Sequence, residues 1–360
     1  MTRGYNFCSG PAMLPDAVMQ RAQQELMEWQ GTGMSVMELS HRSDEFVGVL
    51  ASAEARLRRL LGVSDDFAVL FVQGGATLQF SCVPMNLMGR GGAAEFLDTG
   101  TWSVKAIKEA ARYGEARVLA STKTENYLRA VRADEFNASP DAAYLHYTPN
   151  ETIGGVEFDY VPDSGSVPLV ADMSSCILSK TIDVNDFDLI YAGAQKNIGP
   201  AGLTLVIVRR SLLGKALPGT PSLLDYQAQA ENGSMVNTPP TFAIYLANLV
   251  FEWLESQGGV EAFERLNAEK SGLLYRVIDD SGFYSNPIST PHRSRMNVPF
   301  MLADERLNDT FLAGAQEAGL YNLQGHRSVG GMRASIYNAM PLAGVEALVS
   351  YMKEFEQRHG

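Results

Sequence analysis

Short, continuous apolar runs alternate with stretches of helical character from about residue 65 to residue 210. Strands buried on both faces of a sheet read as unbroken apolar runs, and helices between them are typical of a mostly parallel sheet. The segment Leu78–Leu87 is apolar on several sides and predicts a buried helix after the first run. The seven candidate strands are Ala68–Val72, Ala93–Leu97, Arg117–Ala120, Ala143–His146, Pro168–Ala171, Leu189–Ala192 and Leu203–Val208.

The last two runs are separated only by Gly193–Gly202, which is short for the helical crossover that parallel strands require. We therefore expect the last strand to run antiparallel to its neighbours. The predicted fold class is α/β, with a mostly parallel seven-stranded sheet in a large domain. Ligands of such sheets gather at the carboxyl ends of the strands, so functional residues are expected in the loops there.

The second half of the chain predicts a long helix and then a smaller domain. The helix should cover Thr241–Ser256, with Thr238 as its cap, two prolines in its first turn and Gly258-Gly259 at its end. The elements expected after it are a helix over Ala262–Ser281, a strand over Met296–Met301 and helices over Asn308–Ala318 and Leu342–Arg358. We expect residues 16–258 to form the large domain, and residues 1–15 with 259–360 to form a smaller α+β C-terminal domain.

Charge and cysteine content limit the partners and the compartment. A net charge of −12 argues against a general nucleic-acid binder, because phosphate backbones attract basic surfaces. The chain lacks an apolar run of the roughly 18 residues that a membrane-spanning helix needs, and it begins without a secretory signal. Cys8, Cys82 and Cys176 show neither a disulfide pattern nor the spacing of metal ligands. We expect a cytoplasmic protein that binds neither metal nor membrane.

The segment Gln73–Thr77 follows an apolar strand and opens an apolar helix. Its two glycines let the backbone approach a ligand, and the free N–H groups of a helix N-terminus attract phosphate. Tight strand-to-helix turns that bind nothing also use glycine, so a phosphate site and a plain turn are equally compatible with this segment.

Two ionisable residues follow later strands. Asp172 ends the fifth run, where a carboxylate can pair with a protonated ring nitrogen or can cap the next turn. Lys196 follows the sixth run in a loop of small residues, where desolvation lowers the pKa of an amine and favours nucleophilic attack; a surface lysine is the alternative. Trp102 follows the second run and could stack on a planar ring or could be a core residue. A phosphate site, a carboxylate and a lysine in this order suit an enzyme that binds pyridoxal phosphate (PLP).

Two His-Arg pairs, His41-Arg42 and His326-Arg327, lie beside small or hydroxyl residues. The arginine side chain matches the geometry of carboxylates and phosphates, so these pairs predict anion sites. Arg333 opens an apolar segment and could reach inward to a carboxylate. Surface salt bridges are the alternative for each of these arginines.

A set of stretches distributed over the whole chain resembles one known family. The stretches are Phe7–Pro15, Met37–Arg42, Pro149–Thr152, Asp172–Ser175, Tyr191–Gly202, Asn232–Thr241 and Gly330–Pro341. Together they resemble the class V aminotransferases, a family of the fold-type I PLP-dependent enzymes.

The resemblance implies roles for the cofactor residues. Lys196 should bind the aldehyde of PLP, Asp172 should hold the ring nitrogen, Trp102 should stack on the ring, and Thr152 should lie near the ring hydroxyl. The resemblance also implies a homodimer whose subunits share their active sites. The residues expected to hold the cofactor phosphate are Ala76, Thr77, Gln195 and, from the partner subunit, Asn237 and Thr238.

The resemblance also implies a substrate pocket. Ser9 and Arg42 are expected to contact glutamate, and Arg333 is expected to bind the α-carboxylate. Some members carry arginine at the position of Thr77, so the distal anion pocket should be slightly less cationic in this chain. The residues expected around the substrate phosphate are His41, Arg42, His326 and Arg327.

The implied reaction is a ping-pong transamination in which glutamate gives its amino group to 3-phosphohydroxypyruvate, forming O-phospho-L-serine and 2-oxoglutarate. The phosphorylated 2-oxo acid that precedes 4-phosphohydroxy-L-threonine in pyridoxine synthesis is a second expected substrate. Another class V enzyme, such as an alanine–glyoxylate aminotransferase or a cysteine desulfurase, is one alternative. A non-catalytic phosphate- or nucleotide-binding module that uses Gln73–Thr77 is the other.

Overall fold

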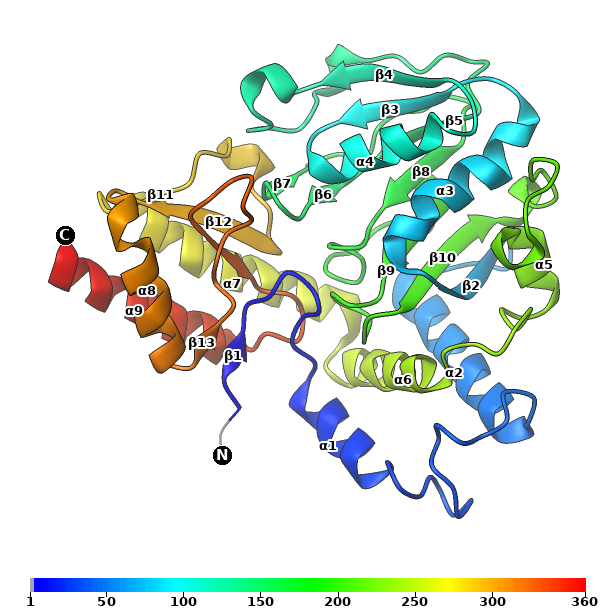
Figure 1. Cartoon of the computed structure of the whole chain (residues 1–360), viewed down its shortest axis with the longest axis horizontal. Helices are drawn as coiled ribbons and strands as arrows, with labels where there is room; N and C mark the ends of the chain where they lie inside the picture. The colour runs from blue at the N-terminus through cyan, green and yellow to red at the C-terminus, as the bar shows by residue number, and fades with distance from the viewer. Residues whose placement is uncertain (1–2) are drawn as a thin grey trace.

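The structure, a computed structural model, describes residues 3–360, so the first two residues of the predicted small domain lie outside it. Its centre is a seven-stranded sheet (Figure 1). All seven predicted strands are confirmed, each to within one residue at its ends. In their order across the sheet they are β2 (Phe67–Gln73), β10 (Leu203–Arg209), β9 (Leu189–Gly193), β8 (Leu169–Asp172), β5 (Tyr144–Tyr147), β3 (Ala94–Asp98) and β4 (Ala116–Ser121).

The sheet is mostly parallel, as predicted. Strands β4, β3, β5, β8 and β9 pair in parallel, whereas β10 runs antiparallel to both of its neighbours, β9 and β2. The short connection from β9 to β10 turns back directly beside the sheet, and it carries Lys196. The expected antiparallel last strand is therefore confirmed, and the tight return places this lysine at the carboxyl end of β9.

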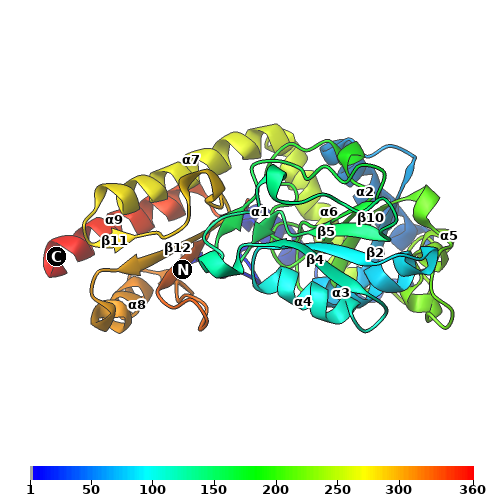
Figure 2. The same cartoon turned by 90° about the horizontal axis from the view of Figure 1, so that it is seen from above.

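Helices cover both faces of the sheet, which explains the unbroken apolar runs. Along β2, Leu70 and Val72 pack into one core cluster, and the alternate residues Val69 and Phe71 pack into another on the opposite face. Figure 2 shows α3 and α4 on one side of the strands and α2 and α6 on the other. The helices of this part are α1 (Asp16–Gln24), α2 (Asp44–Leu61), α3 (Gly75–Leu87), α4 (Thr101–Ala110), α5 (Tyr226–Glu231) and α6 (Thr241–Ser256).

Helix α6 has the predicted bounds, but the prediction that Thr238 caps it is wrong. Pro240 occupies the N-cap position, and no side chain caps the helix. Each residue before a proline is held in an extended conformation, so the two consecutive prolines precede the first turn and keep Thr238 outside it. Gly258, with a φ of 97°, follows the end of the helix, while Gly259 already begins helix α7 (Gly259–Asp280).

The C-terminal part packs around an apolar core of its own. A three-stranded antiparallel sheet packs with α7 and with two later helices, and the N-terminal strand β1 pairs in parallel with β13. Phe7 and Met13 belong to this core, together with residues from 274 to 355. Its other elements are β1 (Tyr5–Asn6), β11 (Tyr284–Ser285), β12 (Asn297–Leu302), α8 (Asn308–Glu317), β13 (Leu320–Tyr321), β14 (Met332–Ser335) and α9 (Leu342–His359).

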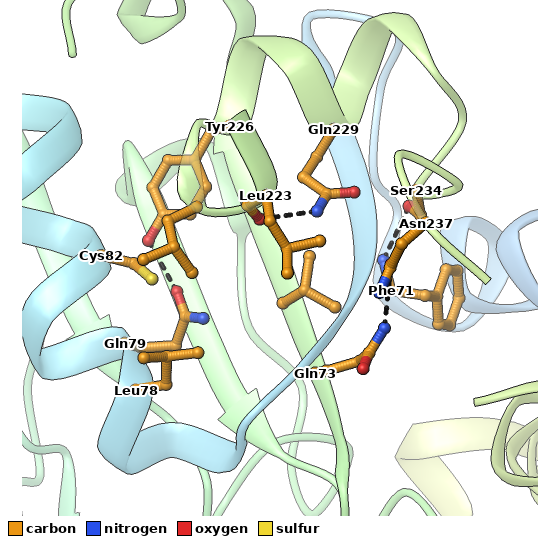
Figure 3. Close-up of a pocket in the computed structure, with 12 residues that line it drawn as sticks. Phe71, Gln73, Leu78, Gln79, Cys82, Leu223, Tyr226, Gln229, Ser234 and Asn237 are labelled. Carbon is orange, nitrogen blue, oxygen red and sulfur yellow. Dashed lines mark hydrogen bonds between the residues drawn. The ribbon is translucent and has the colours of Figure 1, made fainter. Parts of the chain in front are cut away.

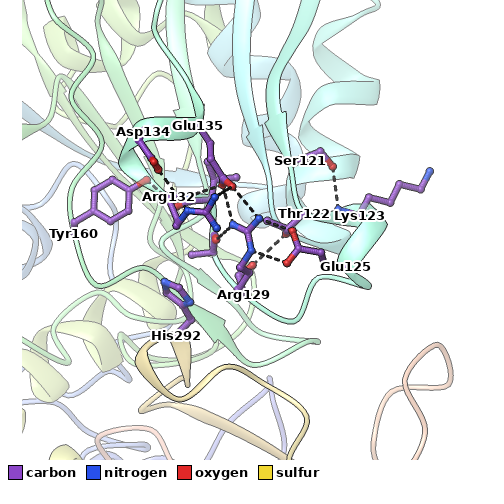
Figure 4. A network of polar contacts seen from close by, with 12 residues as sticks. Ser121, Thr122, Lys123, Glu125, Arg129, Arg132, Asp134, Glu135, Tyr160 and His292 are labelled. Atoms are coloured by element: carbon purple, nitrogen blue, oxygen red, sulfur yellow. Dashed lines mark hydrogen bonds and ion pairs between the residues drawn. The ribbon is translucent and has the colours of Figure 1, made fainter.

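Two smaller features support the edge of the large sheet near its loops. Strands β6 (Asn150–Glu151) and β7 (Val156–Glu157) form a short antiparallel hairpin after β5. Between β4 and β5, Arg129 binds the carboxylates of Glu125 and Glu135, and Arg132 also contacts Glu135 (Figure 4). This charge network joins residues within the long connection from β4 to β5. Among residues 3–360, no helix is both long and apolar enough to cross a membrane.

A buried lysine in α7 organises the segment between β14 and α9. Lys270 is fully buried, and its Nζ donates to the backbone carbonyls of Ile336, Tyr337 and Met340 at 3.0, 2.9 and 3.0 Å. Three acceptors around one amine require three N–H donors, which the ammonium form supplies. The side chain therefore fixes a turn that has no regular secondary structure of its own.

We expect Lys270→Met to lower the free energy of unfolding by about 3–5 kcal/mol, because three buried carbonyls would lose their donors. The measurement is denaturant unfolding of the variant beside Lys353→Met, which removes an exposed lysine from α9. The control should lose less than about 0.5 kcal/mol. Equal midpoints for the two variants would contradict the role given to Lys270.

Candidate active site

A pocket lies at the carboxyl ends of β5, β8 and β9, beside the first turns of α3 and α4. It contains seven of the cofactor residues predicted from sequence, drawn from five separate segments of the chain. Its lining residues are Gly75, Ala76, Thr77, Trp102, Thr148, Asn150, Thr152, Asp172, Ser174, Ser175, Gln195 and Lys196. The strand-end location predicted for the chemistry is therefore the location of a pocket.

The turn between β2 and α3 has the features of an anion site. Gly74 and Gly75 have φ of 96° and 69°, a region that favours glycine, and a Cβ on Gly74 would collide with Leu78. Helix α3 starts at Gly75, so the N–H groups of its first turn, including those of Ala76 and Thr77, have no partner within the helix. These N–H groups and the helix dipole favour a negatively charged ligand.

Asp172 caps the turn that follows β8 and also lines the pocket. Its side chain is 4% exposed and lines the pocket, while the backbone N–H and the hydroxyl of Ser174 donate to its Oδ1 at 3.0 and 2.6 Å. Burial raises the pKa of Asp172, and the hydrogen bonds from Ser174 and the charge of Lys196 oppose this rise. The turn cap thus orients a desolvated carboxylate toward a ligand site.

Lys196 is also buried, at 8% exposure, so the surface alternative is wrong. Its Nζ donates to Oγ1 of Thr152 at 2.6 Å and lies 5.6 Å from the centre of the Trp102 ring. Burial lowers the pKa of Lys196 to about 8, although the nearby carboxylate of Asp172 opposes the shift. A large fraction of this amine is therefore neutral, and nucleophilic, slightly above neutral pH.

We expect the ligand-free chain to capture a small aromatic aldehyde at a rate that rises with pH around a midpoint near 8. Only the deprotonated amine attacks, so the rate follows the neutral fraction of Lys196. Stopped-flow absorbance between pH 6 and 10 measures this phase, and Lys196→Ala should lack it. The control Lys215→Ala, at an exposed lysine, should retain it. A midpoint at the ordinary lysine value of 10.5 would contradict the burial argument.

Trp102 forms one wall of the pocket from the first turn of α4. Its ring is half-buried, packs 6.4 Å from that of Phe80, and has Nζ of Lys105 4.3 Å from its centre. Several buried polar atoms of the lining have no hydrogen-bond partner among the described residues. These atoms are Nε1 of Trp102, Oγ1 of Thr148 and Oδ1 of Asn150. Unpaired buried polar atoms are rare in folded proteins, so the lining is suited to a polar ligand.

Arg333 reaches the rim of this pocket from β14. Its Nη2 donates to Oγ of Ser9 at 2.8 Å, and its Nη1 lies 3.5 Å from the carbonyl oxygen of Thr152. The side chain is 9% exposed, and within residues 3–360 no carboxylate lies at ion-pair distance from it. A buried guanidinium without a counter-ion is a strong site for an anionic ligand.

The two His-Arg pairs are not brought together within one chain. His326 is half-buried near Arg333 and Arg327, and desolvation and the charges of these arginines lower its pKa. His41 and Arg42 belong instead to the connection between α1 and α2. That connection lies at the lower side of Figure 1, apart from the segment that follows β13. The pocket of this chain therefore has one of the two predicted pairs in its vicinity.

Asn237 and Thr238 also lie away from the pocket of their own chain. Nε2 of Gln73 donates to Oδ1 of Asn237 at 3.0 Å, at the edge of a different cavity between β2, α3 and α5 (Figure 3). Both residues are exposed. Neither residue lines the pocket that contains Lys196.

Sequence reasoning gave no role to four residues of the lining: Thr148, Asn150, Ser174 and Ser175. Two of them were within reach, because Ser174 and Ser175 follow Asp172 directly. Thr148 and Asn150 enter the pocket through the strand end of β5 and the hairpin of β6 and β7. Strands of two residues carry no periodicity, so the sequence offered no signal for this hairpin.

The chain matches known proteins along nearly its whole length. The sequence pattern of the aminotransferase class-V family matches residues 4–348. Phosphoserine aminotransferase of Azotobacter vinelandii is 61% identical over 358 residues, with 99% of both sequences covered. Phosphoserine aminotransferase from Bacillus circulans subsp. alkalophilus superimposes with a TM-score of 0.97 at 47% identity, over 99% of both chains. PLP-bound phosphoserine aminotransferase from Trichomonas vaginalis gives a TM-score of 0.93 at 42% identity, over 98% of this chain and 100% of that one. The chain therefore belongs to the class V aminotransferase family.

Proposed function

We propose that this chain is a PLP-dependent transaminase that transfers the amino group of glutamate to 3-phosphohydroxypyruvate, giving O-phospho-L-serine and 2-oxoglutarate. The observation that carries the proposal is the pair of buried ionisable residues, Lys196 and Asp172, that share one pocket with unpaired polar groups. Family membership supports the reaction class. Relatives named phosphoserine aminotransferase, at 61% and 60% identity, support the substrate.

The donor set of the pocket fits PLP. The free N–H groups of the α3 turn suit its phosphate, with Ala76, Thr77 and Gln195 around it, and Lys196 suits its aldehyde. Asp172 suits a protonated ring nitrogen, and Trp102 suits the flat ring. When bound, PLP supplies a protonated aromatic ring that withdraws electrons from the substrate α-carbon.

Several side chains of this protein then take part in the transfer of the proton from the substrate α-carbon. Lys196, as a free amine of lowered pKa, takes the proton from the α-carbon of the amino acid. Asp172 would keep the ring nitrogen of bound PLP protonated, and Ser174 fixes the orientation of that carboxylate. Thr152 holds Nζ of Lys196 within the pocket through its hydroxyl. Trp102 and the buried lining exclude water from the reacting atoms.

Cationic groups at the rim bind the anionic parts of the substrates. Arg333 has the free guanidinium and the burial needed to bind an α-carboxylate in bidentate fashion, with Ser9 beside it. His326 and Arg327 extend the positive field outward from Arg333, where a phosphate or a γ-carboxylate would lie. Thr77 contributes a hydroxyl and no charge at this side of the pocket.

A homodimer with shared active sites completes the pocket in this proposal. Asn237 and Thr238 are exposed beside a different cavity, so they are available to the cofactor phosphate of a second subunit. The connection between α1 and α2, which carries His41 and Arg42, lies apart from the segment after β13 that carries His326 (Figure 1), and a second subunit would let the two pairs meet around one substrate phosphate.

Three further assignments belong to the same proposal. The pocket would also accept the phosphorylated precursor of 4-phosphohydroxy-L-threonine, which links the chain to pyridoxine as well as serine biosynthesis. The enzyme would act in the cytoplasm. Residues 16–258 would form a large domain, and residues 1–15 with 259–360 would form a small domain, in accord with the separate apolar core that joins Phe7 and Met13 to the C-terminal part.

The direct test is an assay of the purified protein with PLP, glutamate and 3-phosphohydroxypyruvate. We expect formation of phosphoserine with matching release of 2-oxoglutarate. Alanine with glyoxylate and cysteine alone serve as competing substrates for the other reactions of the family. Faster turnover of either of these would replace the proposed substrate while leaving the reaction class in place.

We expect Arg327→Ala and Arg42→Ala to lower kcat/KM for 3-phosphohydroxypyruvate by about 10- to 100-fold, which is the loss of one charge-assisted contact. The unphosphorylated analogue hydroxypyruvate should lose less than about threefold. Arg306→Ala, which removes an exposed arginine paired with Asp304, provides the matched control. Equal losses for the two keto acids would remove these arginines from the phosphate pocket.

A further inference from the structure

Glu151 is a buried carboxylate that ends strand β6, directly before Thr152. It is 1% exposed. The backbone N–H of Trp102 donates to its Oε2 at 3.1 Å, and the backbone N–H of Ser103 donates to its Oε1 at 2.9 Å. The hydroxyl of Ser103 also lies 3.0 Å from Oε1. Both carboxylate oxygens are thus bound by the first turn of α4, whose N–H groups have no partner within the helix.

The structure leaves space for this carboxylate and gives it no other charge partner. A Cβ on Gly100 would lie 2.6 Å from Cδ of Glu151, so the glycine before α4 is required for the contact. Within residues 3–360, Lys and Arg side chains make no ion pair with Glu151. Burial raises its pKa to about 7, and the hydrogen bonds from α4 oppose this rise. The helix N-terminus is therefore its main electrostatic partner.

The position of Glu151 connects the two sides of the candidate active site. Its neighbour Thr152 accepts the hydrogen bond from Nζ of Lys196. The carboxylate of Glu151 accepts from the backbone N–H of Trp102, whose ring centre lies 5.6 Å from the same Nζ. Trp102 is the first residue after the start of α4, and its backbone would otherwise be free to shift with the helix end. One dipeptide, Glu151-Thr152, thus contacts both the backbone of Trp102 and the amine of Lys196.

We infer that Glu151 is a positioning residue that holds the first turn of α4 so that the indole of Trp102 lies flat against the bound cofactor ring. The inference rests on the proposed function, because it assumes that PLP occupies the pocket. Glu151 itself does not line the pocket, so it acts through Trp102 and does not touch the cofactor. If Glu151 only stabilised the helix, an apolar residue could replace it. Holding the backbone of Trp102 in place instead requires two hydrogen-bond acceptors at fixed positions.

The test is Glu151→Gln in the full chain, read by PLP titration and by visible circular dichroism of the PLP complex. The amide keeps the shape but turns one N–H group toward a backbone N–H of α4, so one of the two clamping bonds is lost. We expect PLP affinity to fall by about 10- to 100-fold and the visible dichroism band to weaken or shift. Gly100→Ala displaces the carboxylate sterically without removing its charge. It should change the PLP affinity and the dichroism band in the same direction.

Two controls separate positioning from general stability. Glu157→Gln makes the same change at a buried glutamate of the same hairpin, paired with Lys180, and should lower the melting temperature without altering the dichroism band. In a Trp102→Ala background, Glu151→Gln should have no more than about a twofold further effect on PLP affinity. Additive losses, or an unchanged band in both Glu151→Gln and Gly100→Ala, would overturn the inference. A wild-type chain that binds no PLP would instead refute the proposed function, and the inference with it.

Discussion

Lys196→Ala is expected to lower transamination turnover by at least about 10⁴-fold. The variant loses the nucleophile for the PLP aldehyde and the proton carrier together, and general acid–base catalysis alone contributes about 10²–10⁴-fold. The purified wild-type protein should absorb visible light and be bleached by borohydride, whereas the variant should do neither. Initial rates with glutamate and 3-phosphohydroxypyruvate, with absorption spectra before and after borohydride, provide the measurement.

Lys196→Arg is the matched control for charge. Arginine keeps a cation beside Asp172 but stays protonated, so it can neither attack an aldehyde nor accept a proton. The burial of the site and the contact with Thr152 make both variants worth checking for fold by far-UV circular dichroism. Full turnover by the alanine variant would refute the mechanism, however well the fold matches the family.

Asp172→Asn is the second change with a large expected effect, a fall in turnover of about 10²–10³-fold. The substitution keeps the size of the side chain and an oxygen for Ser174, but it removes the charge that would keep a ring nitrogen protonated. The loss should therefore appear in kcat more than in the KM for glutamate. Asp186→Asn, at an exposed aspartate after β8, should leave kcat within about twofold. A loss confined to KM would assign Asp172 to binding alone.

The sequence predicted the central sheet well because its strands are buried on both faces. Val69 and Leu70 face different helices, yet both are apolar because both faces of the strand are buried. Burial on both faces therefore produces continuous apolar runs, whose ends can be located to within one residue. The reversed direction of β10 was predictable from the length of one loop. Helix α2 carried equally readable signals that received no prediction, since Ser43 caps its start and Gly62 adopts a left-handed conformation at its end.

Reasoning from the residue pattern predicted only those site residues that directly follow a long strand. Asp172 and Lys196 follow long apolar runs, and parallel strands bring such positions to one edge. Asn150 reaches the same place through a hairpin whose strands have two residues each, which leaves no pattern in the sequence. The cap assigned to Thr238 failed because local residue preference was weighed without the restriction that two prolines impose. The separation of His41 from His326 depends on how distant segments pack, which local pattern does not encode.

The pairing of the two ends of the chain determines when the rim of the pocket can form during synthesis. Tyr5 pairs with Leu320, and Ser9 contacts Arg333, although more than 300 residues separate each pair. On a ribosome the seven strands of the large sheet emerge well before residue 320, so that sheet can assemble on the nascent chain. The N-terminal strand, although translated first, can pair only after residues 320 and 321 have been translated. An unfinished polypeptide can therefore hold the lysine and carboxylate of the pocket, but the contact between Ser9 and Arg333 at its rim forms only near the end of translation.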